Sequence, residues 1–474
     1  MRILFAASEA LPYWTTGGLA NVARALPDTL AERGHDVRVI LPFYRTIKQQ
    51  RLALEEEGKG VVPWPGGSRP VRYLLHRPAQ GAPALLVDEP EHFDTKHPYG
   101  SAREDPLVTA ERFAFFARTV VERARVWGAD VVHLNDWQTG LVPVYAFLDG
   151  MPAASVFAIH NLAYQGNYAP QLLERIGIPR SFFRTENGLE FWATASFMKA
   201  GLALADRLVT VSPTYAREIQ TPEGGVGFDG LLRFRRRLLH GILNGIDREL
   251  WNPATDLALP QRYDARTLDA KDGVRAALLT ALGLEDRGPL LVAVTRLAQQ
   301  KGIDLLLGAI PWILEHGGSL AVLGSGERVY EKALVAAAAA NPGRIAVELG
   351  FNDPLARRLH AGGDFFLMPS RYEPCGLGQM IAQRYGTPPV VRRTGGLVDT
   401  VQDGLTGFSF PEDTPQGLSH ALQRAFRAWR GRRWGTLRRR CMALDWSWNR
   451  SATQYEEVYR MAVGAAEPQG RSHD

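Results

Sequence analysis

Residues 368–401 read MPSRYEPCGLGQMIAQRYGTPPVVRRTGGLVDTV, and this stretch decides the fold. It starts within the apolar run FFLMPS at 365–370, which is typical of a buried strand, and continues into GLGQMIAQRYG at 376–386, which is typical of a helix. Glu373 and Cys375 therefore fall on the turn that joins the strand to the helix. Because open α/β sheets bind ligands at the carboxyl ends of their strands, the stretch predicts a doubly wound α/β domain with a ligand site at this turn.

The residues of this turn suit a sugar that carries a phosphate. The backbone N–H groups of Gly376, Leu377 and Gly378 are expected among the free donors of the first helical turn, where the helix dipole favours negative charge. Glu373 would be an acceptor beside the phosphate, and a carboxylate in that place is useful only if it holds a neutral group rich in hydroxyls. The alternative, a Glu373 that caps an ordinary helix, stays open from these residues alone.

The alternation of strand-like and helix-like segments occurs in both halves of the chain. The second half contains the apolar runs GPLLVAVTRL at 288–297 and SLAVLGSG at 319–326, and the first half opens on the strand-like RILFAAS. We therefore predict an α/β protein of two Rossmann-like, doubly wound domains that face a deep cleft. The N-terminal domain is expected at 1–240 and the C-terminal domain at 241–474, with the last helix packing back on the N-terminal domain.

Two similar glycine turns support the prediction of two related halves. TGGLANV at 16–22 resembles TGGLVDTV at 394–401, and each follows a strand-like run. Gly17 and Gly18 fall where the first helix opens, and glycine there lets the backbone approach a ligand closely. A plain turn is the alternative at this position.

Charged and polar side chains follow other predicted strands. Arg296 ends the strand LLVAVTR, and Lys301 follows five residues later, so both would point into the same crevice as Glu373. Paired cations at a diphosphate would stabilise the charge on a leaving nucleotide. The chain has no Asp-x-Asp pair, so we do not expect a metal-chelating nucleotide-sugar site. In the first half, Asp136 and His160 follow strand-like runs, although an isolated histidine is more commonly part of a core.

The composition is that of an ordinary soluble protein, with 474 residues, 45% hydrophobic and 22% charged residues, and two cysteines. So few cysteines fit a reducing cytoplasm, and no apolar stretch is long enough to span a membrane. The net charge of +5 suits an anionic substrate. Arginine-rich runs at 233–237 and 437–440 are interpreted as solvated faces, so nucleic acid is not an expected partner. The sequence does not indicate the oligomeric state.

The order of motifs over nearly the whole chain resembles the bacterial glycogen synthases and plant starch synthases. The motifs that carry this resemblance are ILFAASE, TGGLA, VVHLNDWQTGL, IHNLAYQG, MKAGL, VSPTYAREI, GILNGID, TRLAQQKGIDLL, PSRYEPCGL and RRTGGLVDTV. The resemblance implies a fold of the glycosyltransferase-B type. It also implies transfer of glucose from ADP-glucose to the non-reducing end of an α-1,4-glucan such as glycogen or a maltooligosaccharide, with retention of configuration and without a metal or other cofactor.

The resemblance also implies roles for individual residues. Arg296 and Lys301 would hold the diphosphate and stabilise its departure, Glu373 would hold the hydroxyls of the donor glucose, and His160 and Asp136 would line the reaction centre. The donor site would be completed by residues from both halves, namely Thr15, Gly17, Gly18, Asn161, Asn244, Gln300, Cys375, Gly376, Leu377 and Gly378.

The chain departs from the family pattern at four places. Thr15 stands where the family commonly has lysine, Asn21 where it has aspartate, and Gly378 where it has threonine, and the loop at 135–138 reads NDWQ where bacterial members have HDWH. These departures leave the preference between ADP-glucose and UDP-glucose open. They also motivate an alternative, a catalytically weakened glucan-binding or regulatory protein. A sucrose synthase-like enzyme is a third possibility, which the IHNLAYQG and EPCGL segments disfavour.

Overall fold

The structure is a computed structural model that describes residues 1–101 and 104–466. Its contacts divide the chain into two compact units. Unit 1 contains Met1–Val211, Ala216–Ile242 and the chain from Trp448 onward, and unit 2 contains Ser212–Tyr215 and Leu243–Ser447. The sequence predicts a boundary at 240, whereas unit 1 continues to Ile242 and the short segment Ser212–Tyr215 also belongs to unit 2.

Unit 1 is built on a sheet of nine strands within the described residues, in the order β12-β11-β7-β6-β1-β2-β5-β4-β3. Neighbouring strands from β12 to β5 pair in parallel, and β4 and β3 add an antiparallel edge. In sheet order the strands are Leu239–Gly241, Arg207–Thr210, Ala154–Ile159, Val131–Asn135, Arg2–Ala6, Asp36–Pro42, Ala84–Asp88, Gly67–His76 and Glu55–Trp64. The hairpin β3–β4 is the antiparallel edge of an otherwise parallel sheet.

Helices flank this sheet, and their burial follows the apolar spacing of the sequence. In α1 (Gly18–Glu32) the residues Val22, Leu26 and Leu30 recur at helical spacing and are buried. The other helices of unit 1 are α2 (Arg45–Lys48), α3 (Pro90–Phe93), α4 (Pro106–Trp127), α5 (Val142–Asp149), α6 (Leu172–Arg175), α7 (Phe197–Leu204), α9 (Asp229–Phe234) and α18 (Trp448–Ala466), whereas α8 (Pro213–Glu218) begins in unit 2 and ends in unit 1.

The last helix, α18, is part of unit 1. Its Tyr459 hydroxyl lies 2.9 Å from Nδ1 of the buried His133 on β6, and its Glu456 accepts hydrogen bonds from Arg33 at 2.7 and 2.8 Å. Buried apolar side chains of α18 belong to the same core cluster as those of β1 and α1. The N-terminal sheet is therefore closed by the C-terminal end of the described chain.

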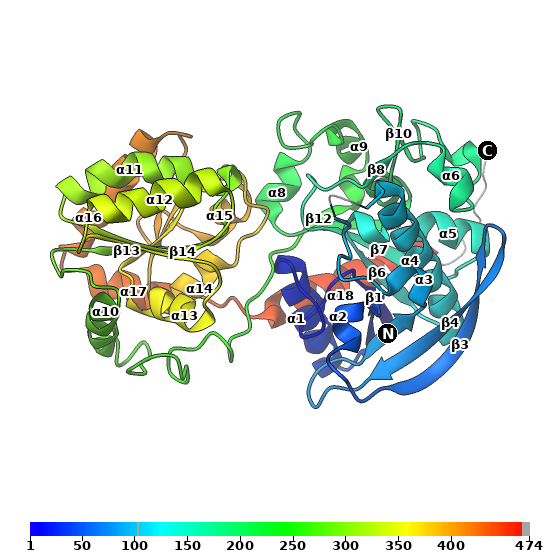
Figure 1. Ribbon diagram of the computed structural model, residues 1–474, viewed down its shortest axis with the longest axis horizontal. Helices are drawn as coiled ribbons and strands as arrows, with labels where there is room; N and C mark the ends of the chain where they lie inside the picture. Colours follow the sequence, from blue (N-terminus) through cyan, green and yellow to red (C-terminus); the bar gives the residue numbers. More distant parts are fainter. Residues whose placement is uncertain (102–103, 467–474) are drawn as a thin grey trace. The chain divides into compact units, whose positions relative to one another are not determined.

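A small antiparallel sheet stands apart from the large one in unit 1. It consists of β8 (Asn167–Tyr168), β10 (Thr194–Ser196) and β9 (Glu190–Phe191), in that order. Figure 1 shows β8 and β10 next to each other, at the end of the connection that follows β7.

Unit 2 contains a parallel sheet in the order β15-β14-β13-β16-β17-β18. Figure 1 shows α11, α12 and α16 over one face and α10, α13, α14 and α17 over the other, so the sheet is doubly wound as the sequence predicts. In sheet order the strands are Ile345–Leu349, Ser319–Gly324, Leu290–Val294, Phe365–Met368, Pro389–Arg392 and Phe408–Phe410. The helices are α10 (Ala270–Ala281), α11 (Ile303–Glu315), α12 (Arg328–Ala340), α13 (Asp353–Gly362), α14 (Gly378–Arg384), α15 (Gly395–Thr400), α16 (Pro415–Trp429) and α17 (Trp434–Met442).

Among the described residues, no helix is both long and apolar enough to cross a membrane.

Candidate active site

Unit 2 contains a pocket of about 230 Å³ at the carboxyl ends of its two central strands, β13 and β16. Parallel strands that are wound in this way leave their carboxyl ends open for a ligand. The structure places six of the sequence-predicted residues in the pocket lining: Arg296, Lys301, Glu373, Gly376, Leu377 and Gly378.

Glu373 and Lys301 form an ion pair in this pocket. Lys301 Nζ lies 2.6 Å from Glu373 Oε2, and the Ser370 hydroxyl donates to the same oxygen at 3.0 Å. Glu373 is 7% exposed, so its charge needs these partners. The pair places a cation and an acceptor side by side, which suits a ligand that carries both a phosphate and hydroxyls.

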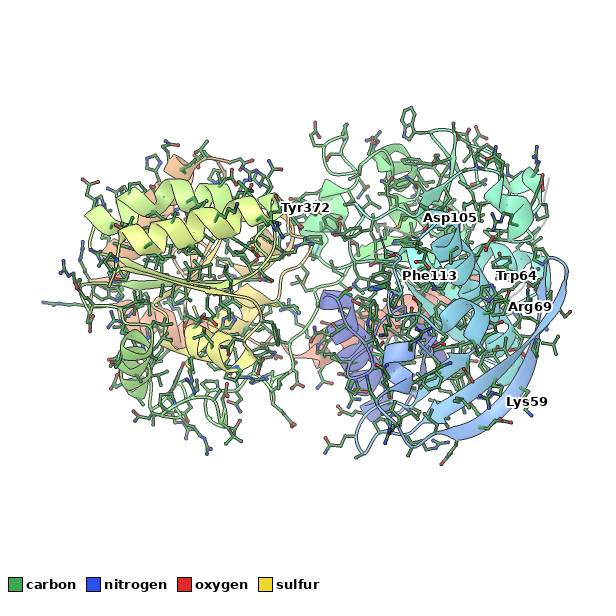
Figure 2. The ribbon with its side chains drawn as sticks, viewed as in Figure 1. Lys59, Trp64, Arg69, Asp105, Phe113 and Tyr372 are labelled. Carbon is green, nitrogen blue, oxygen red and sulfur yellow. The ribbon has the colours of Figure 1, made fainter. Side chains whose placement is uncertain are left out.

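Arg296 is exposed and is oriented by Gln300. Arg296 Nη2 donates to Gln300 Oε1 at 2.8 Å, and Gln300 Nε2 donates to the carbonyl of Tyr372 at 3.3 Å. Tyr372, labelled in Figure 2, belongs to the loop that follows β16. In this structure Gln300 therefore acts on Arg296 and is not part of the pocket lining.

The turn that carries Glu373 differs from the expected helix N-terminus. α14 begins at Gly378, and Gly376 has a φ of +74°, which is left-handed and not helical. The prediction of a helix from 376 was therefore wrong by two residues at its start, because the chain needs a left-handed turn before it can enter the helix. A Cβ at Gly378 would lie 2.9 Å from the Phe366 ring, which explains why a residue larger than glycine does not fit here without a shift of that ring.

Cys375 is buried behind the pocket and does not line it. Burial raises the pKa of its thiol to about 12, so it stays protonated and is a poor nucleophile. The backbone of Asn244 contacts this thiol, and among the described residues no partner reaches the buried Oδ1 of Asn244. A buried amide oxygen without a partner is a place where a ligand group can donate a hydrogen bond.

The second glycine turn, at 394–396, packs against the backbone of the turn that carries Glu373. A Cβ at Gly395 would overlap the Glu373 carbonyl oxygen, and one at Gly396 would overlap the Cys375 carbonyl oxygen. The Gly396 N–H donates to the Glu373 carbonyl at 3.0 Å. These glycines are needed for contact between two backbone segments.

The first glycine turn has no such neighbour. No other part of the described chain lies within 4 Å of a Cβ built on Gly17 or Gly18, and the φ of Gly17 is −166°, which any residue adopts. Next to it, the Thr16 N–H and hydroxyl donate to Glu9 Oε2 at 2.8 and 2.7 Å, and the Thr15 hydroxyl contacts the Gly17 carbonyl at 3.4 Å. Packing against the described residues therefore does not explain the pair at 17–18.

Asp136, His160 and Asn161 come together at the carboxyl ends of β6 and β7 in unit 1. Asp136 Oδ1 accepts the N–H of His160 at 2.8 Å and of Asn161 at 3.4 Å, and Asp136 has a φ of +55°, which is unusual for a residue other than glycine. Burial raises the pKa of the Asp136 carboxyl to about 7 and lowers the pKa of the His160 imidazole to about 4. His160 is therefore neutral at pH 7.

The hydrogen bonds around His160 also define its tautomer. Asn135 Nδ2 donates to the Ala6 carbonyl at 2.9 Å, so its Oδ1 faces His160 Nε2 at 2.8 Å. Because an amide oxygen only accepts, the proton of the neutral imidazole is on Nε2, and Nδ1 keeps its lone pair. His160 can accept a hydrogen bond from a substrate hydroxyl at Nδ1.

Sequence reasoning missed two residues near these sites. Glu9, 2% exposed, fixes the first glycine turn through Thr16, and its signal was a carboxylate directly after the first strand. Phe351, 92% exposed, follows the strand β15 in unit 2, at the sheet edge where β13 and β16 also end. Its signal was an aromatic residue directly after the strand-like run RIAVELG at 344–350.

Within residues 1–101 and 104–466, no three His, Cys, Asp or Glu side chains gather as a metal site would require. The absence of a metal from the reaction stays a prediction.

Comparison with known proteins extends over nearly the whole chain. Residues 2–234 match the family model of the starch synthase catalytic domain, and residues 288–428 match that of the glycosyl transferases group 1. A glycogen synthase of Anaeromyxobacter sp. (strain Fw109-5) is 47% identical over 97% of this chain and 99% of that protein, and one of Syntrophotalea carbinolica is 44% identical over 98% and 99%. The catalytic domain of starch synthase IV from Arabidopsis thaliana, bound to ADP and acarbose, superposes with a TM-score of 0.88 at 32% identity, covering 98% of this chain and 99% of that chain.

Proposed function

Because this chain belongs to the family of bacterial glycogen synthases and plant starch synthases, we propose that it transfers glucose from ADP-glucose to the non-reducing end of an α-1,4-glucan. The observation that carries the proposal is the pocket of unit 2, where Lys301, Arg296 and Glu373 lie together. The chain has two cysteines, too few for a disulfide framework, which fits a cytoplasmic enzyme.

The two cations of the pocket would act on the leaving group. As the bond between glucose C1 and the diphosphate breaks, negative charge develops on the phosphate oxygen. Lys301 and Arg296 would stabilise this charge, and preorganised groups of this kind usually supply the largest share of catalysis. Gln300 would hold the Arg296 guanidinium in place for this task, since the two side chains are already hydrogen-bonded.

Glu373 would hold the donor sugar. Its contacts with Lys301 and Ser370 both use Oε2, and a glucose hydroxyl would donate to the same carboxylate. Lys301 and Glu373 would neutralise each other before a donor binds, so neither would be an uncompensated buried charge.

Unit 1 would supply the groups that surround the reacting sugar. The neutral His160 would accept a donor hydroxyl at Nδ1, with Asp136 fixing the backbone of His160 and Asn161. The open space at Gly17 and Gly18 would admit the donor close to the backbone, which explains two glycines that packing does not require. Thr15 would offer a hydroxyl and no charge.

We expect attack on the same face that the diphosphate leaves. The O4 hydroxyl of the glucan forms the new bond to C1, the bond from C1 to the phosphate oxygen breaks, and that oxygen takes the hydroxyl proton. Configuration is then retained without a covalent enzyme intermediate.

Phe351 would be the residue that receives the base of the nucleotide. An aromatic side chain that is 92% exposed offers a ring face for stacking, and it follows a strand of the sheet that carries the pocket.

The decisive experiment measures nucleotide release from ADP-glucose and, separately, from UDP-glucose, with and without glycogen. Glycogen-dependent release of ADP supports the proposal and shows that Thr15 is tolerated. Release of UDP alone would keep the chemistry and change the donor. No release from either donor, in a folded protein that binds glycogen, would favour the weakened glucan-binding protein instead.

A further inference from the structure

A tryptophan at a hairpin tip of unit 1 is unusually exposed. Trp192 connects β9 to β10 and is 79% exposed, whereas most tryptophans bury a large part of their surface. Burying an indole ring is strongly favourable, so a ring left in water at a well-defined position calls for an explanation.

The backbone of this turn is also held in an unfavourable conformation. Trp192 has a φ of +48° and Ala193 a φ of +61°. Two-residue hairpin turns with two positive φ angles strongly prefer Asn-Gly or similar pairs, because a Cβ is strained there. The turn therefore carries a bulky residue at a position where glycine or asparagine would be more stable, and residues kept under strain cluster at functional sites.

Several contacts make the turn rigid. The Ala193 N–H donates to Glu190 Oε1 at 2.9 Å, and the Thr185 hydroxyl donates to Glu190 Oε2 at 3.0 Å. Lys199 Nζ donates to the Thr185 carbonyl at 2.7 Å. The indole is thus presented by a fixed loop, which lowers the entropic cost of binding.

The Phe191 ring contacts the Trp192 indole edge-on, with ring centroids 6.3 Å apart. Phe191 stacks on Phe228 with ring centroids 4.1 Å apart, and a Cβ at Gly227 would come within 2.8 Å of the Phe191 ring and 3.2 Å of the Trp192 indole nitrogen. With a φ of +87°, Gly227 adopts a left-handed conformation that suits glycine, and its missing side chain leaves room for the Phe191 and Trp192 rings.

The hairpin is structurally continuous with the residues assigned to the reacting sugar. The segment after His160 and Asn161 becomes β8, which pairs with β10 (Figure 1). In the same segment, Gln165 Nε2 donates to the Val226 carbonyl at 3.0 Å, and Tyr164 is 54% exposed. The segment that follows His160 and Asn161 is therefore paired directly with the hairpin that carries the exposed ring.

We propose that the Trp192 turn is a stacking platform for the α-glucan acceptor. The inference rests on the proposed function, which requires unit 1 or unit 2 to hold a long, uncharged glucan. A glucan has no charge for a protein to pair with, and its pyranose rings have flat C–H faces that pack on an indole ring. An exposed, uncharged ring, on a hairpin paired with the segment that follows His160, matches this ligand.

The test compares Trp192→Ala, Trp192→Phe and Trp192→Gly with the wild type in native gels that contain increasing glycogen. We expect the affinity for glycogen and for maltoheptaose to fall roughly three- to tenfold in Trp192→Ala and Trp192→Gly, the size of one lost stacking contact, and by less than about twofold in Trp192→Phe. KM for glycogen should rise by the same factor, while KM for ADP-glucose and kcat at saturating glycogen change less than about twofold.

Two controls separate binding from folding. Trp192→Gly should be at least as stable as the wild type because glycine suits the positive φ, so weaker glycogen binding in a more stable protein would support the platform. Phe147→Ala removes another exposed aromatic ring of unit 1, on α5, and should leave glycogen affinity unchanged.

Unchanged glycogen retardation in Trp192→Ala would overturn the proposal, and so would a wild type that glycogen does not retard. A second copy of the chain is the alternative partner of the Trp192 ring, and light scattering tests it. If Trp192→Ala changes the molecular mass in solution and keeps its glycogen affinity, the ring contacts a second copy of the chain. Gel retardation needs no turnover. If the wild type releases no nucleotide and Trp192→Ala binds glycogen more weakly than the wild type, the proposed enzyme is refuted and the platform is supported.

Discussion

Replacing Lys301 with methionine tests whether its pairing with Glu373 serves the reaction or only the fold. The two charged atoms lie 2.6 Å apart, and the Lys301 and Glu373 side chains are 18% and 8% exposed. Methionine keeps the aliphatic stem and removes the ammonium group. Among the described groups that donate to the Glu373 carboxylate, the Ser370 hydroxyl then remains.

The expected loss of stability follows from this burial. Breaking a fully buried ion pair costs about 3–5 kcal/mol, and because the Lys301 side chain reaches solvent we expect about 2 kcal/mol. For a unit of about 200 residues this lowers Tm by roughly 4–8 °C. Losing a cation at the leaving phosphate should lower kcat by roughly 10²–10³-fold.

The double variant Lys301→Met with Glu373→Gln separates the two effects. It leaves no unpaired buried charge, so we expect it to regain at least half of the lost Tm, while kcat stays as low as in the single variant or falls further. Thermal unfolding and ADP release at saturating substrates measure both. A folded Lys301→Met variant with kcat within about tenfold of the wild type would refute the catalytic reasoning, and a double variant no more stable than Lys301→Met would refute the account of the buried charge.

Three further predictions use other features of the structure. Burial lowers the pKa of His360 to about 3, so the folded protein favours the neutral imidazole, and the free energy of unfolding falls as the pH drops below about 6.5. His360→Phe should therefore reduce the loss of unfolding free energy between pH 7.5 and pH 5 by about 2 kcal/mol in urea titrations. Gly395→Ala should lower Tm by several degrees and abolish most activity because its Cβ would overlap the Glu373 carbonyl, whereas Gly17→Ala should leave Tm unchanged and raise KM for the donor; equal Tm values for the two variants would contradict this. Phe351→Ala should raise KM for the nucleotide sugar roughly three- to tenfold with KM for glycogen unchanged, and steady-state kinetics with each substrate varied in turn would reveal the opposite pattern.

The sequence predicted the doubly wound α/β class and most strands because buried parallel strands are continuous apolar runs, as in SLAVLG at β14. It missed β3, whose residues alternate in burial at a sheet edge and include two glycines and a proline, and β18, which has only three residues. The family match confirms the glycosyltransferase fold and the recognition of the family.

The candidate site was less predictable, because distances between residues remote in the chain decide it. The similar TGGL turns have different surroundings: Gly395 packs against the backbone of Glu373, whereas Gly17 faces open space, and no local pattern distinguishes them. The exposure of Trp192 and Phe351 depends on the folded surface and is not visible in the sequence. The individual roles of the site residues remain predictions for the variants above.

The position of α18 has a consequence for how the chain is made. When residue 447 has emerged from the ribosome, every residue of unit 2 has been synthesised, including Ser212–Tyr215. The helix α18, whose Tyr455 and Tyr459 complete the core around β1 and α1, has not yet emerged. The part of the protein that is synthesised first is therefore finished last, in contrast to the usual order in which N-terminal domains fold first during synthesis. Until α18 has left the ribosome, the apolar surface that it covers stays open to solvent, and a nascent chain stalled near residue 447 is the form in which a chaperone would find it.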